Sequence, residues 1–229
     1  MNLIFGLGNP DKKYSWTRHN IGKDVLKAFA KDVFNGLELS VNKKLNAEII
    51  EGAFSFIGAS DKSYAKVEGA QTKGEGDQMG MESNAIREEN SNDLDSLHKV
   101  ILARPLCYMN EVGSVAAKLV KYYDVDLKNL LIIYDELDLP VGEYKLSFDK
   151  GSHIHNGILS IQNHLKSNKF WHLRVGVRNE KIPQSVQKTG RDPSKYVLTK
   201  FSLTDKNKLE KLIQNSLITD LTRFLSKKQ

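Results

Sequence analysis

The chain has 229 residues, of which 40% are hydrophobic and 27% are charged, a composition typical of a globular protein with a sizeable buried core. Its single cysteine, Cys107, excludes a disulfide framework within the chain, and no apolar run is long enough to form a membrane helix. No basic stretch precedes an apolar run at the start of the chain, so we expect no secretory signal, no membrane partner and a cytoplasmic location.

Predicted strands and helices alternate along the chain. In chain order, the predicted elements are a strand over 2–7, a helix over 18–34, strands over 47–57 and 100–103, a helix over 111–123, strands over 130–134 and 142–148, a helix over 157–165, a strand over 173–177 and a helix over 205–226. The first helix is predicted from apolar residues at every fourth position between Ile21 and Val33. The alternation predicts a sheet that is covered by helices on both faces.

The segment 58–98 differs in composition from the rest of the chain. It is rich in Gly, Ser, Asn, Glu and Asp, and it has few large apolar residues and no periodicity. Such a segment buries too little apolar area to offset its ordering entropy, so we expect a disordered insert. Its nine acidic and four basic residues give a net charge of −5, which leaves +11 on the remainder against a total of +6. The basic remainder favours a polyanionic partner such as nucleic acid.

The first predicted strand ends in a glycine turn, Gly6-Leu-Gly8-Asn9-Pro10. Two glycines after a strand also begin a dinucleotide-binding motif, but position 11 is Asp, and Pro10 lacks the amide that a pyrophosphate would use. A tight turn that presents Asn9 is the better interpretation. The run Thr17-Arg-His19-Asn20 then opens a predicted helix, where His19 taken alone is better interpreted as a solvent-exposed residue.

Three further loops follow predicted strands and present polar side chains. The acidic run Asp135-Glu-Leu-Asp-Leu-Pro140 could cap a helix or turn, or bind a hard cation. Asn110 and Asn156 each lie just before a predicted helix and could be helix caps. His153 and His155 indicate a metal site only weakly, because no convincing third ligand accompanies them.

If the four loops meet at one edge of the sheet, they form a cleft lined by amides, an imidazole and a carboxylate. Amide N–H groups can stabilise a carbonyl oxygen that gains negative charge. The imidazole of His19 can take a proton from water, and a carboxylate such as Asp135 can fix its tautomer. No serine or cysteine stands in a strand–turn–helix elbow. The pattern therefore favours direct attack by water, without a covalent intermediate, a metal or another cofactor.

In this order, the loops resemble those of the bacterial-type peptidyl-tRNA hydrolase family. The matching segments are Gly6-Leu-Gly-Asn-Pro10 with Tyr14 and Thr17-Arg-His-Asn20, Arg104-Pro105 with Tyr108-Met-Asn110 and Gly113, Asp135-Glu-Leu-Asp-Leu-Pro140 with Gly142, His155-Asn-Gly157, Phe170-Trp-His-Leu-Arg-Val-Gly176, and Tyr196-Val-Leu198 with Phe201. The resemblance covers the chain except 58–98. It implies one domain over 1–229, interrupted by the insert, with a three-layer α/β/α fold and a mixed, mostly parallel central sheet.

The resemblance also implies an activity, the hydrolysis of the ester that joins a peptide to the 3′-ribose of tRNA, which recycles tRNA from prematurely released chains. In the family, the residue matching His19 activates water, that matching Asp135 supports it, and that matching Asn9 helps to distinguish N-blocked from free aminoacyl esters. The residues that line the site for the peptide and the 3′ end match Tyr14, Tyr108, Asn110 and Asn156. Arg174 and Lys145 match residues that hold tRNA phosphate, where basic contacts dominate affinity.

The chain departs from the family pattern in three places. His153 and Ile154 stand where glycines are usual, Arg178 also replaces a glycine, and the acidic insert is additional. Two other functions are compatible with the sequence: a non-catalytic RNA-binding protein on the same fold, which would not need both His19 and Asp135, and a metal-dependent hydrolase. No long apolar seam requires an oligomer, so we expect a monomer that binds peptidyl-tRNA.

Overall fold

A computed structural model of the protein describes residues 1–34, 36–54, 68–71, 98–152, 154–179 and 192–226. Its described strands form one sheet in the order β2-β3-β5-β1-β6-β8-β7, with β4 also paired to β3. The strands are β1 (Asn2–Gly6), β2 (Ser40–Asn42), β3 (Ala47–Phe54), β4 (Glu68–Gln71), β5 (His98–Pro105), β6 (Leu130–Pro140), β7 (Tyr144–Phe148) and β8 (Trp171–Arg178). The central strands β5, β1, β6 and β8 are parallel neighbours, whereas the outer strands join by antiparallel pairs.

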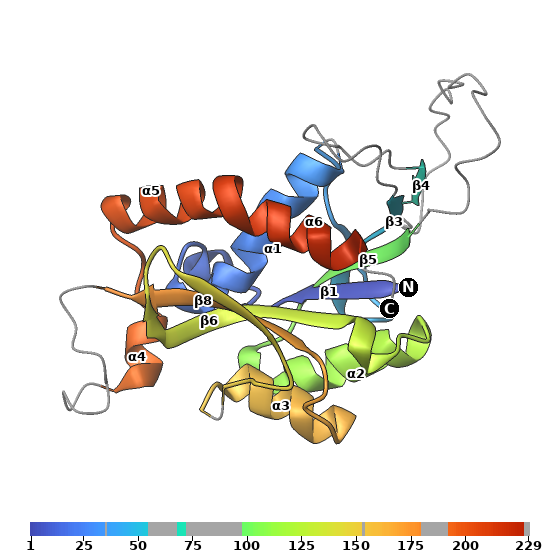
Figure 1. Cartoon of the computed structure of the whole chain (residues 1–229). Coiled ribbons are helices and arrows are strands. Elements are labelled where there is room, and N and C mark those ends of the chain that lie inside the picture. The colour runs from blue at the N-terminus through green and yellow to red at the C-terminus, as the bar shows by residue number, and fades with distance from the viewer. Residues whose placement is uncertain (35, 55–67, 72–97, 153, 180–191, 227–229) are drawn as a thin grey trace.

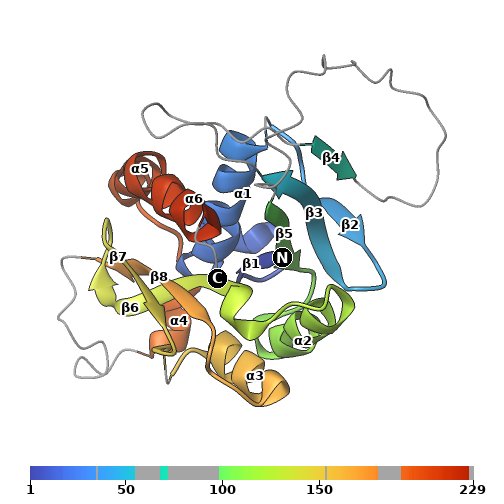
Figure 2. The same cartoon turned by 45° about the vertical axis from the view of Figure 1, so that its right-hand side comes forward.

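Helices cover both faces of this sheet (Figures 1 and 2). One layer contains α1 (Ile21–Val33), α5 (Leu203–Leu212), the π-helical turn η7 (Ile213–Leu217) and α6 (Ile218–Ser226). The other layer contains α2 (Val112–Tyr122) and α3 (Asn156–Leu165). The short helix α4 (Pro193–Val197) contacts η2 (Arg18–Asn20), a 3-10 turn that precedes α1. The arrangement confirms the expected three-layer α/β/α fold with a mixed sheet and a parallel centre.

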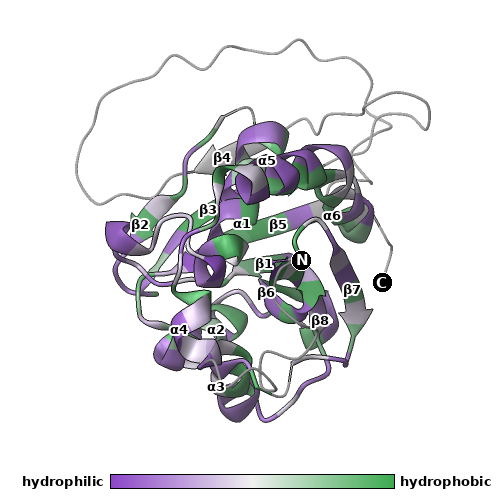
Figure 3. Cartoon of the chain, turned by 90° about the vertical axis from the view of Figure 1, so that its left-hand side faces the viewer, coloured by the Kyte–Doolittle hydropathy of each residue, from purple (hydrophilic) through white to green (hydrophobic). Residues whose placement is uncertain are grey.

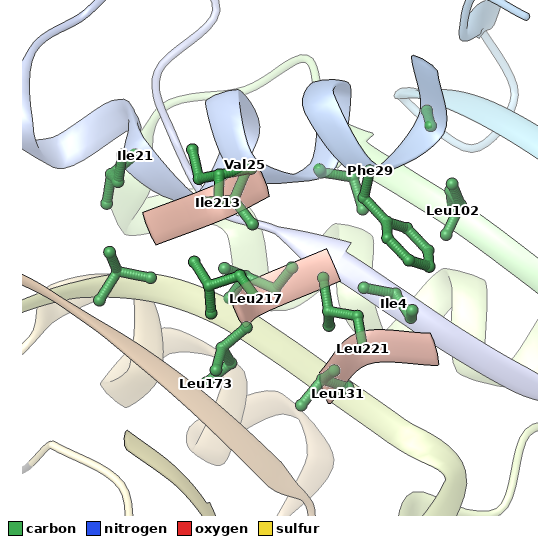
Figure 4. Close-up of a cluster of buried hydrophobic side chains, with 14 of the residues drawn as sticks. Ile4, Ile21, Val25, Phe29, Leu102, Leu131, Leu173, Ile213, Leu217 and Leu221 are labelled. Atoms are coloured by element: carbon green, nitrogen blue, oxygen red, sulfur yellow. The ribbon is translucent and has the colours of Figure 1, made fainter. Parts of the chain in front are cut away.

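Each face of the sheet has its own apolar core. Ile4 of β1 packs with Phe29 of α1 and Leu217 of η7 on one side, as Figure 4 shows. Its neighbour Phe5 packs on the other side, in the core that includes Ile161 of α3. This alternation follows from the two-residue period of a strand. Figure 3 shows hydrophobic residues along β5 in the sheet and hydrophilic residues on the outer helices.

Within the segment 58–98, where we expect a disordered insert, the structure describes one strand, β4. β4 pairs with β3 at Glu51↔Gln71 and Ala53↔Glu68, a backbone interaction that composition does not reveal. His98 begins β5. The rest of the segment, and residues 55–57 of the predicted strand, lie outside the described residues. β2 and α4 are also additional to the predicted elements. Among the described residues, no helix is both long and apolar enough to cross a membrane.

The predicted strand over 130–134 continues as β6 to Pro140, so Asp135 lies within a strand rather than in a loop after it. β1 pairs with β6 only as far as Gly6↔Ile133, whereas β8 accompanies β6 through Glu136↔Gly176. After Ile133, the edge of β6 that faces β1 is therefore unpaired within the described residues, and the segments that follow β1 can approach it. Asp135 stands at this position, where the functional groups meet.

Candidate active site

Asn9 is held in a fixed orientation after β1. Its backbone N–H donates to Asn20 Oδ1 (2.9 Å), and its carbonyl accepts from Asn20 Nδ2 (3.0 Å) and Lys23 Nζ (3.1 Å). Its side-chain Oδ1 accepts from the backbone N–H of Met109 (3.0 Å). In the described part of the chain the Asn9 Nδ2 group has no partner, so it can donate to a bound substrate.

Close packing of backbone against backbone sets the position of η2 and α1. A Cβ on Gly22 would lie 2.2 Å from the carbonyl oxygen of Ile133, a distance that real Cβ atoms do not tolerate. Only glycine therefore allows the start of α1 to approach β6 this closely. The same approach carries His19, three residues earlier, to the open edge of β6.

Arg18 anchors η2 to β8 and to the segment after α4. Its buried guanidinium donates through Nε to Val177 O (3.1 Å) and through Nη1 to Thr199 Oγ1 (2.7 Å), and Nη2 lies 3.6 Å from Asp205 Oδ2. Its Cζ also lies 4.5 Å from the ring centroid of Tyr196. Arg18 belongs to a sequence motif, but its anchoring role is not visible from the sequence because its partners are more than 150 residues away.

His19 and Asp135 are 116 residues apart in the sequence but are in direct contact in the structure. His19 Nδ1 lies 2.9 Å from Asp135 Oδ1. Burial alone would lower the pKa of His19, but the charge and hydrogen bond of Asp135 raise it above its ordinary value of 6.5. Since Nδ1–H donates to the carboxylate, Nε2 is the ring nitrogen that can accept a proton.

His155 is a second histidine on the same carboxylate oxygen. Its Nε2 lies 2.9 Å from Asp135 Oδ1, and the ring centroids of His19 and His155 are 4.9 Å apart. Burial would raise the pKa of Asp135, but electrostatic attraction and hydrogen bonds from the rings of His19 and His155 hold it well below its usual range. The sequence indicates His155 only as part of a motif and as a weak metal ligand, and its contact with Asp135 is visible only in the structure.

The buried side chains of Tyr134 and His172 support the turn before α3. The Tyr134 hydroxyl accepts the backbone N–H of Ser152 (3.0 Å) and lies 3.3 Å from Nδ1 of His172. His172 is fully buried, and burial lowers its pKa from 6.5 to about 4. A Cβ on Gly151 would lie 2.4 Å from His172 Cε1, so the turn must contain glycine here to lie against that ring.

A pocket of about 530 Å³ contains most of the predicted site residues. It is lined by Asn9, His19, Tyr108, Met109, Asn110, Asp135, Glu136, Leu137, Ser152, Ile154, His155, Asn156, Asp192, Pro193, Ser194, Val197 and Leu198. Tyr14, Lys145 and Arg174 are not among these residues. The pocket lining thus combines polar side chains with apolar ones such as Leu137 and Val197.

The three predicted residues outside the lining lie beside it. Tyr14 makes an edge-to-face contact with Tyr108, with ring centroids 6.5 Å apart. Arg174 Nη1 lies 3.4 Å from Glu136 Oε2, and Arg174 pairs directly with Lys145 across β7 and β8. The two basic residues are therefore adjacent on one face of the sheet, and Arg174 contacts Glu136, a residue of the pocket lining.

Neither Asn110 nor Asn156 is a helix cap. His155 caps α3 instead: its Nδ1 accepts the backbone N–H of Ile158 (3.3 Å). Asn156 is the first residue of α3, and Asn110 lies in a 3-10 turn before α2. Both asparagines are exposed pocket residues, and their side-chain amides have no partner within the described ranges. His153 lies outside the described residues, and the side chain of Ile154 is 54% exposed.

The group His19, Asp135 and His155 has the donor types of a metal site, with ligand atoms within 4.8 Å of one another. The cap of α3 opposes metal binding. Because His155 Nδ1 accepts a hydrogen bond, its proton is on Nε2, the nitrogen that faces Asp135. A metal on Nε2 would require that proton to leave or move to Nδ1, which would break the cap. The geometry favours two N–H donors on one carboxylate.

Fold and site together define the class: an α/β protein with a carboxylate-bound histidine in a polar pocket beside parallel strands, an arrangement suited to general-base hydrolysis. The sequence matches the Peptidyl-tRNA hydrolase family model over residues 3–73 and 63–228. The chain therefore belongs to the peptidyl-tRNA hydrolase family, in agreement with the resemblance found from its loops.

Individual relatives agree with this assignment. The chain is 31% identical over 209 residues to the peptidyl-tRNA hydrolase of Rhodococcus erythropolis, which covers 91% of this chain and 83% of the relative. It is 32% identical over 206 residues to that of Geobacillus thermodenitrificans, covering 90% and 83%. The crystal structure of the Acinetobacter baumannii peptidyl-tRNA hydrolase has the same fold, with a TM-score of 0.68, 24% identity, and coverage of 99% of this chain and 88% of that one.

Proposed function

We propose that the protein hydrolyses the ester bond between the peptide and the 3′-ribose of peptidyl-tRNA, as a monomer in the cytoplasm and without a metal. The observation that carries this proposal is the His19–Asp135 hydrogen bond in a pocket that also presents three asparagine side chains. Membership of the peptidyl-tRNA hydrolase family supports the choice of substrate.

In the proposed reaction, Nε2 of His19 takes a proton from water while the water oxygen attacks the ester carbonyl carbon. Asp135 stabilises the imidazolium that forms. The amide of Asn9 donates to the carbonyl oxygen as it gains charge. The bond to the 3′-oxygen then breaks, and that oxygen takes the proton from His19. The products are a free 3′-hydroxyl and a peptide carboxylic acid, which releases its remaining proton to solvent as it becomes a carboxylate.

The remaining predicted residues have proposed roles in substrate binding. Asn110 and Asn156 contact the peptide and the 3′ end, since their amides point to no other partner within the described residues. Tyr108, with Tyr14 against it, offers an aromatic surface at the mouth of the pocket. Arg174 and Lys145, adjacent across β7 and β8, hold tRNA phosphate.

A cleavage assay with an N-acetylated aminoacyl-tRNA tests the proposal. We expect the wild type to release the amino acid at the same rate with and without EDTA, and His19→Ala to lose activity by roughly 10²–10⁴-fold. His164→Ala, an exposed histidine of α3 outside the pocket lining, is the matched control and should remain active. Binding of tRNA without cleavage by the wild type would instead establish the non-catalytic alternative. Loss of activity with EDTA would overturn the metal-free mechanism.

A further inference from the structure

His155 is a buried residue of the pocket lining that the proposed mechanism does not use. Its side chain is 5% exposed, and both of its ring nitrogens have partners: Asp135 Oδ1 at Nε2 and the Ile158 N–H at Nδ1. A nitrogen that accepts a backbone N–H carries no proton. The helix cap therefore holds His155 as the neutral tautomer with its proton on Nε2.

This tautomer has a consequence for Asp135. The carboxylate oxygen Oδ1 accepts from His155 Nε2 and from His19 Nδ1, each at 2.9 Å. A hydrogen bond from a neutral donor withdraws electron density from the carboxylate and fixes its rotamer. Asp135 is thus oriented toward His19 while its negative charge is partly neutralised.

We propose that His155 is a second positioning residue of this site, one that donates its Nε2–H to Asp135 and thereby sets both the orientation and the basicity of His19. As a contribution to catalysis, the role rests on the proposed hydrolytic function. As an effect on the proton affinity of His19, it stands independently of the substrate, because it follows from the shared carboxylate.

Other charged groups near His19 are already engaged. Glu136 lines the pocket but contacts Arg174 Nη1 at 3.4 Å, and Asp192 accepts the Ser194 N–H (3.0 Å) as the cap of α4. Lys23 of α1 donates to the Asn9 carbonyl. Arg18, next to His19 in η2, is bound to carbonyls of β8 and the segment after α4. Among the described residues, Asp135 and His155 are the titratable groups that contact His19 directly.

Two substitutions separate the cap from the contact with Asp135. His155→Asn keeps an acceptor near the position of Nδ1 for the Ile158 N–H, but it is too short to reach Asp135. His155→Gln places an amide donor near the position of Nε2 and restores the bond to Asp135. A purely structural role predicts that the variant that keeps the cap, His155→Asn, behaves more like the wild type.

The decisive measurement is the titration of His19, followed by NMR of its ring in full-length protein, together with the pH profile of kcat/KM. We expect the pKa of His19 to rise by roughly half a unit or more in His155→Asn and to remain near the wild-type value in His155→Gln. The acid limb of kcat/KM should move to higher pH in His155→Asn only. An unchanged His19 pKa in His155→Asn, or an equal shift in both variants, would overturn the inference. The NMR titration gives its answer even for a protein that cleaves no ester, which keeps the two proposals distinguishable.

Discussion

The side-chain amide of Asn9 has its oxygen in a hydrogen bond, whereas its Nδ2 group has no partner among the described residues. Its Oδ1 accepts the Met109 N–H at 3.0 Å, which orients Nδ2 as a donor for the pocket. This division of roles is visible only in three dimensions, because Met109 lies 100 residues away in sequence. It also allows a near-isosteric test of the donor.

Asn9→Asp retains the acceptor for Met109 and replaces the donor by a carboxylate oxygen. We expect kcat/KM for an N-acetylated aminoacyl-tRNA to fall by about 10²-fold, the usual effect of removing a donor to a developing oxyanion. The carboxylate should also attract a free α-ammonium, so that the preference for blocked over free aminoacyl-tRNA decreases. Both rates are measured by release of labelled amino acid.

Asn42→Asp is the matched control, since Asn42 Oδ1 also accepts a backbone N–H, that of Leu45 at 3.0 Å, but lies outside the pocket lining. Its kinetics should equal those of the wild type. An Asn9→Asp enzyme with an unchanged preference for blocked substrates would show that Asn9 does not contact the amino end of the substrate.

His172 links the site to acid stability. Its pKa is about 4 in the folded protein against 6.5 in an unfolded chain, so the unfolded state takes up the proton first as the pH falls. The stabilising effect is present above pH 6.5 and is lost as the pH falls toward 4. His172→Gln removes this titration. When the pH falls from 6.5 to 5, we therefore expect the free energy of unfolding to decrease by roughly 2 kcal/mol less in His172→Gln than in the wild type.

Urea unfolding at both pH values measures this difference. His164→Gln, at an exposed position of α3, should show the pH dependence of the wild type. Equal pH dependence in His172→Gln and the wild type would mean that His172 is not neutral in the folded protein.

At the scale of elements, Gly113 sets the distance between α2 and α3. A Cβ at this position would lie 2.1 Å from Ser160 O, and the Gly113 N–H donates to Ser160 Oγ (3.1 Å). The same hydroxyl donates to the Asn110 carbonyl (2.8 Å). This contact joins the helix that follows Asn110 to the helix that begins with Asn156, so it determines how the two amides face the pocket.

Gly113→Ala should push the two helices apart. We expect the free energy of unfolding to fall by about 1–3 kcal/mol, as for other overpacked interiors, and KM for the blocked aminoacyl-tRNA to rise. Thermal unfolding and steady-state kinetics measure the two effects. Ser114→Ala, one residue further along the same helix, removes only an exposed hydrogen bond to the Glu111 carbonyl, so it is the control and should change neither. A normal KM together with a lowered melting temperature would show that the packing of α2 against α3 does not affect substrate binding.

The C-terminal helix shows how far periodicity predicts an element. Buried residues recur at every fourth position from Leu209 through Ile213 and Leu217 to Leu221, which correctly predicted a helix with one apolar face. An α-helix has 3.6 residues per turn, so a spacing of four drifts by about 40° at each step. The wider π-helical turn η7 takes up this drift. The apolar pattern predicted the face, but a single sequence does not show where the wider turn forms.

Asp135 and His155 mark the corresponding limit for the site. Charge at position 135 indicated the end of a strand, whereas β6 continues because β8 pairs with it through Glu136. The resemblance to the peptidyl-tRNA hydrolase family implied that Asp135 supports His19, but the contact between them is visible only in the structure. The contact of His155 with Asp135 was not predicted, since it depends on His155, rather than Asn156, capping α3.

At the scale of the whole molecule, the charge of the chain is unevenly distributed. Residues 72–97 contain seven acidic and two basic residues, a net charge of −5. The residues on either side of this segment pair with β3: Gln71 pairs with Glu51, and His98 pairs with Phe54. We expect that replacing 72–97 by a Gly-Ser linker, while keeping β4, preserves the fold and the turnover of saturating substrate.

The replacement should also change tRNA binding, because it raises the net charge of the chain from +6 to +11. We expect the Kd for tRNA to fall about 3–10-fold at low ionic strength, and the difference to shrink as salt screens long-range attraction. A scrambled 72–97 segment keeps length and charge and is the control, which should bind like the wild type. If the linker variant bound tRNA no more tightly than the scrambled one at low salt, the acidic segment would have no electrostatic effect on the substrate. A large fall in melting temperature in the linker variant alone would instead show that the segment contributes to the stability of the fold.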